Sequence, residues 1–198
     1  GFVPKTYIPN YSEFYEGRHF TPGEETVTEY QLSGRKIPFG INLLFRCTEL
    51  PELVIGCEIC EDLWVPLPPS VNLAQGGAHI IVNLSASDEM VGKDSYRRDL
   101  VKGQSARLVC GYIYATAGEG ESSQDLVFGG QNLIAENGTM LAEAKRFQNT
   151  VIYGEIDVQR LADERRRIST YPSADSAECQ MVPFDVEIEE TSLTRNFA

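Results

Sequence analysis

Residues 53–64 read Leu53-Val54-Ile55-Gly56-Cys57-Glu58-Ile59-Cys60-Glu61-Asp62-Leu63-Trp64. This segment begins as an apolar strand and ends at a cysteine that is followed by two acids and, soon after, by an aromatic residue. Many α/β enzymes present a nucleophile in this way, at the carboxyl end of a strand just before the chain turns. The segment therefore predicts a layered α/β fold with Cys60 at one edge of a sheet.

The two cysteines of this segment have different expected environments. Side chains alternate between the two faces of a strand. Cys57 shares a face with the apolar side chains at positions 53, 55 and 59, which predicts a buried, inert thiol. Cys60 is the last residue of the strand and lies beside the turn, where it can meet a substrate. A lone cysteine is more often structural than catalytic, so that alternative stays open for Cys60.

The acids around Cys60 set a condition on any reactivity of its thiol. Glu58, Glu61 and Asp62 bring negative charge close to Cys60, and negative charge disfavours a thiolate. A reactive Cys60 therefore requires a cation from another part of the chain.

The elements expected around this strand alternate in type. Further strands are expected at residues 26–30, 36–47, 79–84, 112–117 and 150–156, and helices at residues 70–75, 94–110 and 157–167. The strand 79–84 is continuously apolar, which predicts burial of both its faces. Ser70 and Asp157 are expected as helix N-caps, and Gly111 as a helix stop. This order predicts a layered α/β domain.

Two other segments have distinct patterns. Residues 129–143 are expected to form a hairpin, because Glu136-Asn137-Gly138 is a strong turn signal. The chain from Ser169 onward is polar, acidic and interrupted by proline, which predicts a linker.

Composition and charge exclude several classes of protein. The chain has 198 residues, of which 42% are hydrophobic and 23% are charged, as in an ordinary globular domain. Its formal net charge is -12 and its basic residues do not cluster, which argues against nucleic acid or an anionic membrane as a partner. No apolar run is long enough to span a bilayer, and the N-terminus has no signal-peptide pattern.

The cysteine pattern argues against disulfides and metals. The five cysteines are scattered and odd in number, which favours reduced thiols and a cytoplasmic location. Cys57 and Cys60 form a C-x-x-C, but His19 and His79 lack the spacing of zinc ligands. A redox pair usually opens a helix, whereas this pair closes a strand.

A second motif supplies the missing cation. Lys5 is followed by Thr6-Tyr7-Ile8-Pro9 and then by Phe14-Tyr15-Glu16. This pattern resembles the lysine motif of the nitrilase (carbon–nitrogen hydrolase) superfamily, and the segment around Cys60 resembles its nucleophile motif. Residues 58–64 with the prolines that follow them resemble one branch, the glutaminase domains of glutamine-dependent NAD+ synthetases. Other matches to that branch occur in order at residues 83–87, 92–93, 96–97, 104–107, 112–114, 117–122 and 125–130.

The resemblance implies a fold and a division of the chain. The implied fold is the nitrilase-like α-β-β-α sandwich. Residues 1–157 would be the latter part of the glutaminase domain, and residues 158–198 a helix and linker toward an ATP-dependent synthetase domain. The glycine-rich pyrophosphatase loop of that second domain does not occur in this sequence.

The resemblance also assigns catalytic roles. Cys60 would be the nucleophile and Lys5 the cation of a Glu-Lys-Cys triad, and the backbone N–H of Glu61 would be a second oxyanion donor. Glu16 matches a supporting carboxylate that orients the lysine. The triad glutamate is expected upstream of Lys5, where this sequence has only Gly1-Phe2-Val3-Pro4, so the chain by itself is expected to be inactive.

The implied substrate is L-glutamine. Tyr11, Ser87 and Lys93 match substrate-contacting positions of the branch, and Lys93 suits the α-carboxylate of glutamine. Trp64 would be either a pocket wall or a core residue. No cofactor is expected for the glutaminase part, whereas ATP and Mg²⁺ would belong to the synthetase domain. The ammonia released would amidate deamido-NAD there. A homo-oligomer is expected by analogy only.

Two other functions remain open from the sequence. The chain could belong to a free-standing amidase or carbamoylase of the same superfamily, although the linker-like tail argues against it. It could also be a catalytically silent fragment or assembly module, because the triad glutamate is absent from it.

Overall fold

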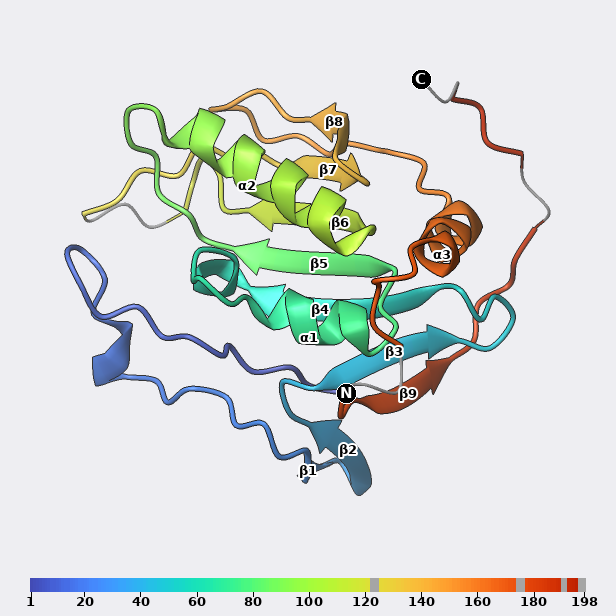
Figure 1. The fold of residues 1–198 in the computed structure, drawn as a ribbon. Coiled ribbons are helices and arrows are strands. Elements are labelled where there is room, and N and C mark those ends of the chain that lie inside the picture. The colour runs from blue at the N-terminus through green and yellow to red at the C-terminus, as the bar shows by residue number, and fades with distance from the viewer. Residues whose placement is uncertain (122–124, 174–176, 190–191, 196–198) are drawn as a thin grey trace.

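The computed structural model describes residues 1–121, 125–173, 177–189 and 192–195. Its centre is a mixed seven-stranded sheet with the order β8-β7-β6-β5-β4-β3-β9 (Figure 1). The strands of this sheet are β3 (Leu43–Cys47), β4 (Val54–Ile59), β5 (Ile80–Ser85), β6 (Gly111–Thr116), β7 (Leu133–Glu136), β8 (Thr139–Glu143) and β9 (Gln180–Phe184). The expected α/β class is thereby confirmed.

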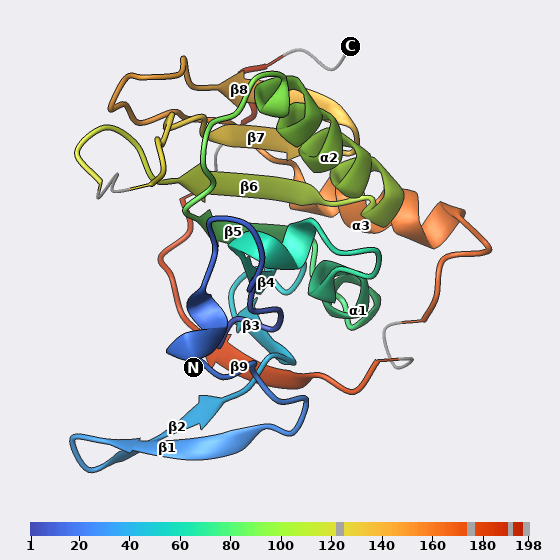
Figure 2. The same cartoon turned by 90° about the vertical axis from the view of Figure 1, so that its left-hand side faces the viewer.

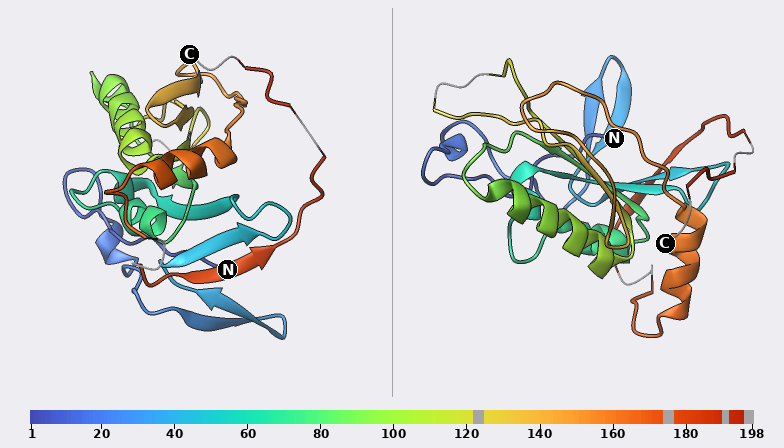
Figure 3. Two further views of the ribbon diagram at one scale, coloured as in Figure 1. Left: turned by 45° about the vertical axis from the view of Figure 1, so that its right-hand side comes forward. Right: turned by 90° about the horizontal axis from the view of Figure 1, so that it is seen from above.

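Three α-helices pack around this sheet. They are α1 (Pro69–Gln75), α2 (Lys93–Leu108) and α3 (Val158–Arg167). Helices α1 and α2 cover one face of the sheet, and α3 lies beside the amino ends of the central strands (Figures 1 and 3). The core lies between the sheet and α1 and α2, where Leu44, Leu73, Ile81 and Val101 are fully buried. Among the residues described, no helix is both long and apolar enough to cross a membrane.

The central strands β4, β5 and β6 run parallel to one another. Their carboxyl ends therefore meet at one edge of the sheet, which is the usual place for a site in an α/β protein. The 3₁₀ helix η2 (Cys60–Leu63) begins directly after β4 at this edge. The N-terminal segment, with its 3₁₀ helix η1 (Glu16–Arg18), lies alongside the same edge (Figure 2).

The two faces of β4 are covered differently from what the alternation predicted. Val54, Gly56 and Glu58 are buried beneath α1, whereas Cys57 is only half-buried on the opposite face. A Cβ at Gly56 would lie 3.0 Å from the Cβ of Leu73, so glycine lets α1 approach the strand closely. The prediction that Cys57 belongs to the core was therefore wrong, although partial burial still raises the pKa of its thiol.

Two of the three predicted helix boundaries were also wrong. Ser70 is the second residue of α1, and its N–H donates to Glu58 Oε2 at 2.8 Å instead of its side chain capping the helix. Helix α2 ends at Leu108, its C-cap is Val109 with a φ of 47°, and Gly111 already starts β6. The third boundary is confirmed, because Asp157 Oδ1 accepts the N–H of Arg160 at 2.9 Å and caps α3.

The structure contains two hairpins, β7–β8 and β1–β2, and the sequence predicted the first of them. Strands β7 and β8 pair around Asn137 and Gly138, whose φ values of 43° and 84° confirm the predicted tight turn. The single strand expected at 36–47 is instead two strands, β2 (Arg35–Phe39) and β3, separated at residues 40–42. Strand β2 pairs with β1 (Thr28–Leu32) in a separate two-stranded sheet, on the side of the main sheet away from α1 and α2 (Figures 2 and 3).

Three other predictions were wrong. Residues 150–156 form no strand, and Tyr153 is 85% exposed. Part of the expected linker is β9, which pairs in parallel with β3 at the sheet edge. Leu84 is 63% exposed, so β5 is covered on one face only at that point. The matched residue Ser122 and the last residues 196–198 lie outside the described ranges.

The environment of His79, beside Arg165, is expected to make the free energy of unfolding depend on pH. The Arg165 guanidinium donates to four backbone carbonyls, including those of Ala78 and Val109, and so fixes α3 against the amino ends of β5 and β6. His79 lies next to it, with Nδ1 2.8 Å from the carbonyl oxygen of Glu52. Burial, reinforced by the charge of Arg165, lowers the pKa of His79 to about 4.

We predict that His79 destabilises the protein in acid. A folded-state pKa below the unfolded value means that the unfolded chain binds the proton more tightly, so stability is lost as the pH falls from 6.5 toward 4. The full loss from this group is about 3 kcal/mol. Urea unfolding of the protein at several pH values should show this loss, and His79→Asn should remove it while keeping a donor for Glu52. An unchanged acid limb in the variant would contradict the assignment.

Candidate active site

The turn from β4 into η2 places Cys60 in an unusual backbone conformation. Its φ is 49°, in the left-handed region that residues with a side chain rarely adopt. A strained residue at a sharp strand-to-helix turn is how α/β enzymes expose a nucleophile. The Cys60 side chain is only partly buried, and the residue has a free thiol.

Lys5 reaches the same edge from the N-terminal segment. Its Nζ lies 2.6 Å from Glu16 Oε2, and both side chains are partly shielded from solvent. The sequence predicted Glu16 as the carboxylate that orients this lysine, and the structure brings the two side chains together.

Asp62 joins the lysine segment to the cysteine turn. It is fully buried, and its carboxylate accepts the N–H of Ile59 at 2.9 Å and that of Tyr7 at 2.8 Å. A longer bond of 3.3 Å comes from the N–H of Thr6. Burial raises the pKa of Asp62, while these three hydrogen bonds and the charge of Lys5 oppose that rise. One side chain thus holds the residues next to Lys5 against the residue before Cys60.

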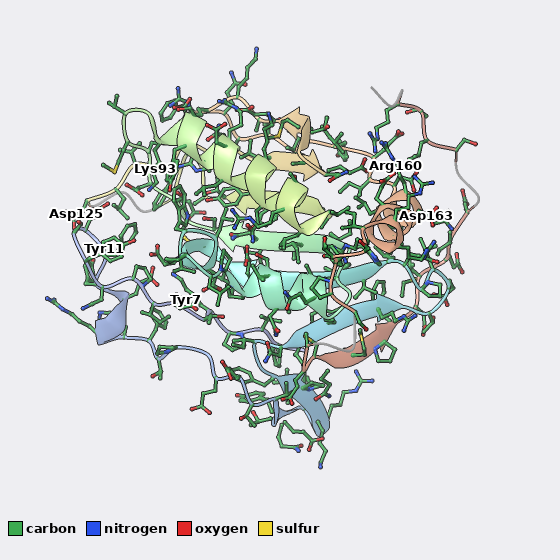
Figure 4. The ribbon with its side chains drawn as sticks, in the orientation of Figure 1. Tyr7, Tyr11, Lys93, Asp125, Arg160 and Asp163 are labelled. Carbon is green, nitrogen blue, oxygen red and sulfur yellow. The ribbon has the colours of Figure 1, made fainter. Side chains whose placement is uncertain are left out.

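We predict that Asp62→Asn loosens this connection. An amide offers one acceptor oxygen, whereas the backbone presents donors to both oxygens of Asp62, so at least one N–H would face an NH₂ group. The expected destabilisation is about 1–3 kcal/mol. Urea unfolding measures it, and Asp163→Asn on the exposed surface of α3 serves as the control (Figure 4). Equal stability of Asp62→Asn and the wild type would contradict this role.

Asn83 supports the Cys60 turn from the neighbouring strand. It is fully buried on β5, and its Oδ1 accepts the N–H of Cys60 at 3.0 Å. Asn83 begins the matched motif at residues 83–87, which assigned no role to it. The signal was present, because a buried polar side chain inside an apolar strand requires a hydrogen-bond partner.

Ser87 follows β5 and is held from beneath by α2. Its Oγ accepts a hydrogen bond of 3.2 Å from the guanidinium of Arg97, and its N–H donates to Thr116 Oγ1 at 3.2 Å. Arg97 is fully buried and also binds Glu89 Oε1 at 2.8 Å and Gln131 Oε1 at 2.6 Å. The predicted contact Ser87 is therefore a buried, fixed residue, and Arg97 is a fixing group that sequence reasoning missed.

Lys93 is the first residue of α2, which agrees with the helix expected from residue 94. Its ammonium forms an ion pair with the buried Asp88 and lies 5.2 Å from the ring centre of Trp64. Trp64 also contacts Tyr96, with ring centres 5.5 Å apart, and packs against the core. Trp64 therefore combines both roles considered for it, since it is partly core and also borders Lys93.

Tyr11 lies across from the cysteine turn, at the same end of the sheet as Lys93 (Figure 4). Its hydroxyl donates to Glu61 Oε1 at 2.8 Å. Partial burial and this hydrogen bond to a carboxylate raise the pKa of Tyr11 to about 12. Tyr11 and Glu61 were separate candidates by sequence, and the structure joins them as a hydrogen-bonded pair.

A pocket of about 310 Å³ opens between the N-terminal segment and the loops after β5 and β6. Its walls include Phe14, Glu16 and Phe128, together with Glu13 and Ala86. The pocket contains one member of the Lys5–Glu16 pair, so it adjoins the candidate site.

The arrangement can perform nucleophilic chemistry. A thiol sits in a strained turn, and a lysine is anchored to that turn through Asp62. Glu61 is the second residue of η2, so its N–H belongs to the first turn, which a helix leaves without an internal partner. A cation and a backbone N–H beside a thiol are suited to attack on a carbonyl carbon and to stabilising the resulting oxyanion.

Comparison with known sequences agrees with this chemistry. The family model described as Carbon-nitrogen hydrolase matches residues 5–166. A glutamine-dependent NAD(+) synthetase of Mycobacterium bovis is 44% identical over 173 residues, which cover 86% of this chain and 26% of that protein. A synthetase of the same name from Saccharomyces cerevisiae is 29% identical over 212 residues. The chain thus spans about a quarter of the length of these relatives.

Solved structures show the same fold. A glutamine-dependent NAD(+) synthetase from Cytophaga hutchinsonii superposes with a TM-score of 0.64 at 33% identity, over 74% of this chain and 23% of that one. A carbon-nitrogen hydrolase from Helicobacter pylori G27 superposes with a TM-score of 0.60 at 22% identity, over 83% of this chain and 54% of that one. The second likeness concerns the fold alone.

Proposed function

Because the chain belongs to the carbon–nitrogen hydrolase family, we propose that Cys60 attacks the side-chain amide of L-glutamine and releases ammonia. The observation that carries this proposal is the left-handed φ of 49° at Cys60, in a turn that Asp62 ties to the segment of Lys5. The relatives' names support glutamine as the substrate. Glutamate release by the complete protein that contains this chain tests it, with and without the Cys60 thiol.

The proposed reaction has two steps. The Cys60 thiolate adds to the amide carbon of glutamine. The C–N bond then breaks, ammonia leaves, and a γ-glutamyl thioester remains on the Cys60 sulfur. Water then adds to the thioester and releases glutamate and the thiol. Lys5 Nζ and the N–H of Glu61 stabilise the oxyanion in both steps, and Glu16 orients Lys5.

We assign the proton transfers to a glutamate N-terminal to Lys5, as the family resemblance implies. Residues 1–4 contain no acid, so a chain limited to these 198 residues is expected to be inactive. The distinction is measurable, because the complete protein should hydrolyse glutamine and the isolated 198-residue chain should not.

The glutamine backbone has candidate partners at the sheet edge. Lys93 suits the α-carboxylate, and its ion-pair partner Asp88 would accept from the α-ammonium group. Tyr11 and Ser87 are the other proposed contacts, with Trp64 as the apolar neighbour of the Lys93 ammonium. The hydroxyl of Ser87 accepts from Arg97 and also hydrogen-bonds to the Tyr114 hydroxyl, which fixes its position at the sheet edge.

We further propose a place for the ammonia. In the complete protein a synthetase domain would use it, with ATP and Mg²⁺, to amidate deamido-NAD to NAD+. The chain's similarity to glutamine-dependent NAD(+) synthetases supports this role. Residues 158–198 would then lead toward that domain, and a cytoplasmic homo-oligomer remains the expectation by analogy.

A further inference from the structure

Three buried polar side chains lie directly behind the Cys60 turn and have no part in the proposed reaction. They are Glu58 on β4, Asn83 on β5 and Tyr112 on β6, and each is at most 1% exposed. Buried polar groups are retained when they are fully hydrogen-bonded, and such networks fix one arrangement of the chain. Their position beneath Cys60 suggests that the arrangement being fixed is the turn itself.

The three side chains form an unbroken series of hydrogen bonds. Cys60 N–H donates to Asn83 Oδ1 at 3.0 Å, and Asn83 Nδ2 donates to the Tyr112 hydroxyl oxygen at 3.2 Å. The Tyr112 hydroxyl in turn donates to Glu58 Oε1 through a short contact. The other carboxylate oxygen of Glu58 accepts the N–H of Ser70 at 2.8 Å.

The two ends of this series set its direction. Both of its ends, the N–H of Cys60 and the N–H of Ser70, can only donate. Burial raises the pKa of Glu58, and the hydrogen bonds from Tyr112 and Ser70 oppose that rise. When Glu58 is ionised, its carboxylate offers an acceptor to each side, so the Tyr112 hydrogen points to Glu58 and the Asn83 amide turns its oxygen to Cys60. Each group has the role that its neighbour requires, and reversing one would place two donors against each other.

We propose that Glu58, Tyr112 and Asn83 are positioning residues that hold the Cys60 backbone in its left-handed conformation through this directional relay. The effect of the relay on catalysis rests on the proposed role of Cys60 as the nucleophile. The relay itself acts on the main chain and not on the substrate. It connects the turn to three adjacent parallel strands and, through Ser70, to the start of α1.

Two variants interrupt the relay with little change of shape. Tyr112→Phe removes only the hydroxyl, which leaves the Asn83 amide without its acceptor. Glu58→Gln replaces one acceptor oxygen by a donor. If that NH₂ faces Tyr112, the Tyr112 hydrogen loses its acceptor. It regains one only if the Asn83 amide turns over, which places the Asn83 NH₂ against the Cys60 N–H. If that NH₂ faces Ser70 instead, it meets the Ser70 N–H at the start of α1, so that two donors oppose each other.

The first test is amide hydrogen exchange of the complete protein, read at individual residues. In wild type both Cys60 N–H and Ile59 N–H should be protected, the first by Asn83 and the second by Asp62. Both relay variants should speed exchange at Cys60 by about tenfold or more while leaving Ile59 unchanged. Unchanged exchange at Cys60 would overturn the relay, and so would an equal rise at both residues, because that would show general loosening.

The second test is steady-state kinetics with glutamine. The relay predicts a fall in kcat of about ten- to a hundredfold in each variant, with KM little changed, because the thiol is misplaced and substrate contacts are intact. The double variant should lose no more than the worse single one, since both changes break one unit. The matched control is Tyr171→Phe, which removes a hydroxyl bond of 2.8 Å to Leu108 O far from the site and should keep kcat.

The two tests separate this proposal from the proposed function. Independent effects of the two relay variants on kcat, or an unchanged kcat in both, would overturn the relay. A wild-type protein that does not hydrolyse glutamine would overturn the proposed function instead, and amide exchange at Cys60 would still decide whether the relay exists.

Discussion

Replacing Cys60 with alanine is expected to reduce glutamate release from glutamine at least about a thousandfold, because no thioester can form without the thiol. No other cysteine is placed to substitute for it. Cys110 is fully buried, and burial raises its pKa to about 12, while Cys57 lies on the half-buried face of β4. The measurement is ammonia and glutamate production by the complete protein at saturating glutamine.

The matched control for this experiment is Cys57→Ala, three residues away on the same segment. It should retain turnover, because Cys57 contributes no group to the proposed site. This control also separates hydrolysis from dithiol chemistry, since a C-x-x-C redox pair would need both cysteines equally. Undiminished turnover in Cys60→Ala, or equal losses in the two variants, would contradict the account.

Replacing Lys5 with alanine is expected to have the second largest effect. Loss of one oxyanion donor typically costs about 3–4 kcal/mol of barrier, or about a hundred- to a thousandfold in kcat. The bond of 2.8 Å from Tyr7 N–H to Asp62 holds the segment of Lys5 at the turn, and the ion pair of 2.6 Å with Glu16 orients the Lys5 ammonium. The same cation offsets the acids that surround Cys60 in sequence.

A second lysine ion pair provides the control for Lys5→Ala. Lys36 lies 2.8 Å from Glu29 on an exposed surface of the β1–β2 hairpin, and Lys36→Ala should leave kcat unchanged. Glu16→Gln should give a smaller loss than Lys5→Ala, since the carboxylate only orients the ammonium. Normal kcat in Lys5→Ala would show that its charge does not serve the reaction.

The central part of the fold was predictable because local pattern and burial agree there. Strands β4, β5 and β6 are short apolar runs, α2 has helical spacing, and Asn137-Gly138 specifies a tight turn. The agreement between apolar pattern and buried face is incomplete. Helix α2 buries Arg97, Gln104 and Ser105, while Tyr96 is 56% exposed. On β4 the buried face carries Gly56 and Glu58, because α1 needs the glycine and Glu58 finds donors in Tyr112 and Ser70.

The outer elements were not predictable because their structure depends on distant partners. Strand β9 contains Pro183 and is mostly exposed, which is unlike a strand by sequence, and it forms only because the edge of β3 is open to pair with it. Residues 150–156 show the converse. Val151 and Tyr153 favour a strand, but they pair with none of the strands that the structure describes, and both are exposed.

The residues of the candidate site also divide into those that could be predicted from the sequence and those that could not. Cys60, Lys5 and Glu16 could be named from motifs, because each motif is contiguous in the sequence. Asp62, Asn83 and Arg97 could not be given roles, since their partners other than Ile59 lie 8 to 56 residues away along the chain. Their contribution is visible only once the strands are paired.

The most direct test of the central claim is covalent capture of the nucleophile. A glutamine analogue with an electrophilic carbon in place of the side-chain amide should label the complete protein once within this chain, and peptide mass spectrometry should place the label on Cys60. Free glutamine should protect that cysteine, and Lys5→Ala should slow the labelling. Labelling of Cys57 or Cys179 at the same rate as Cys60, without protection by glutamine, would contradict the assignment of Cys60 as the glutamine-binding nucleophile.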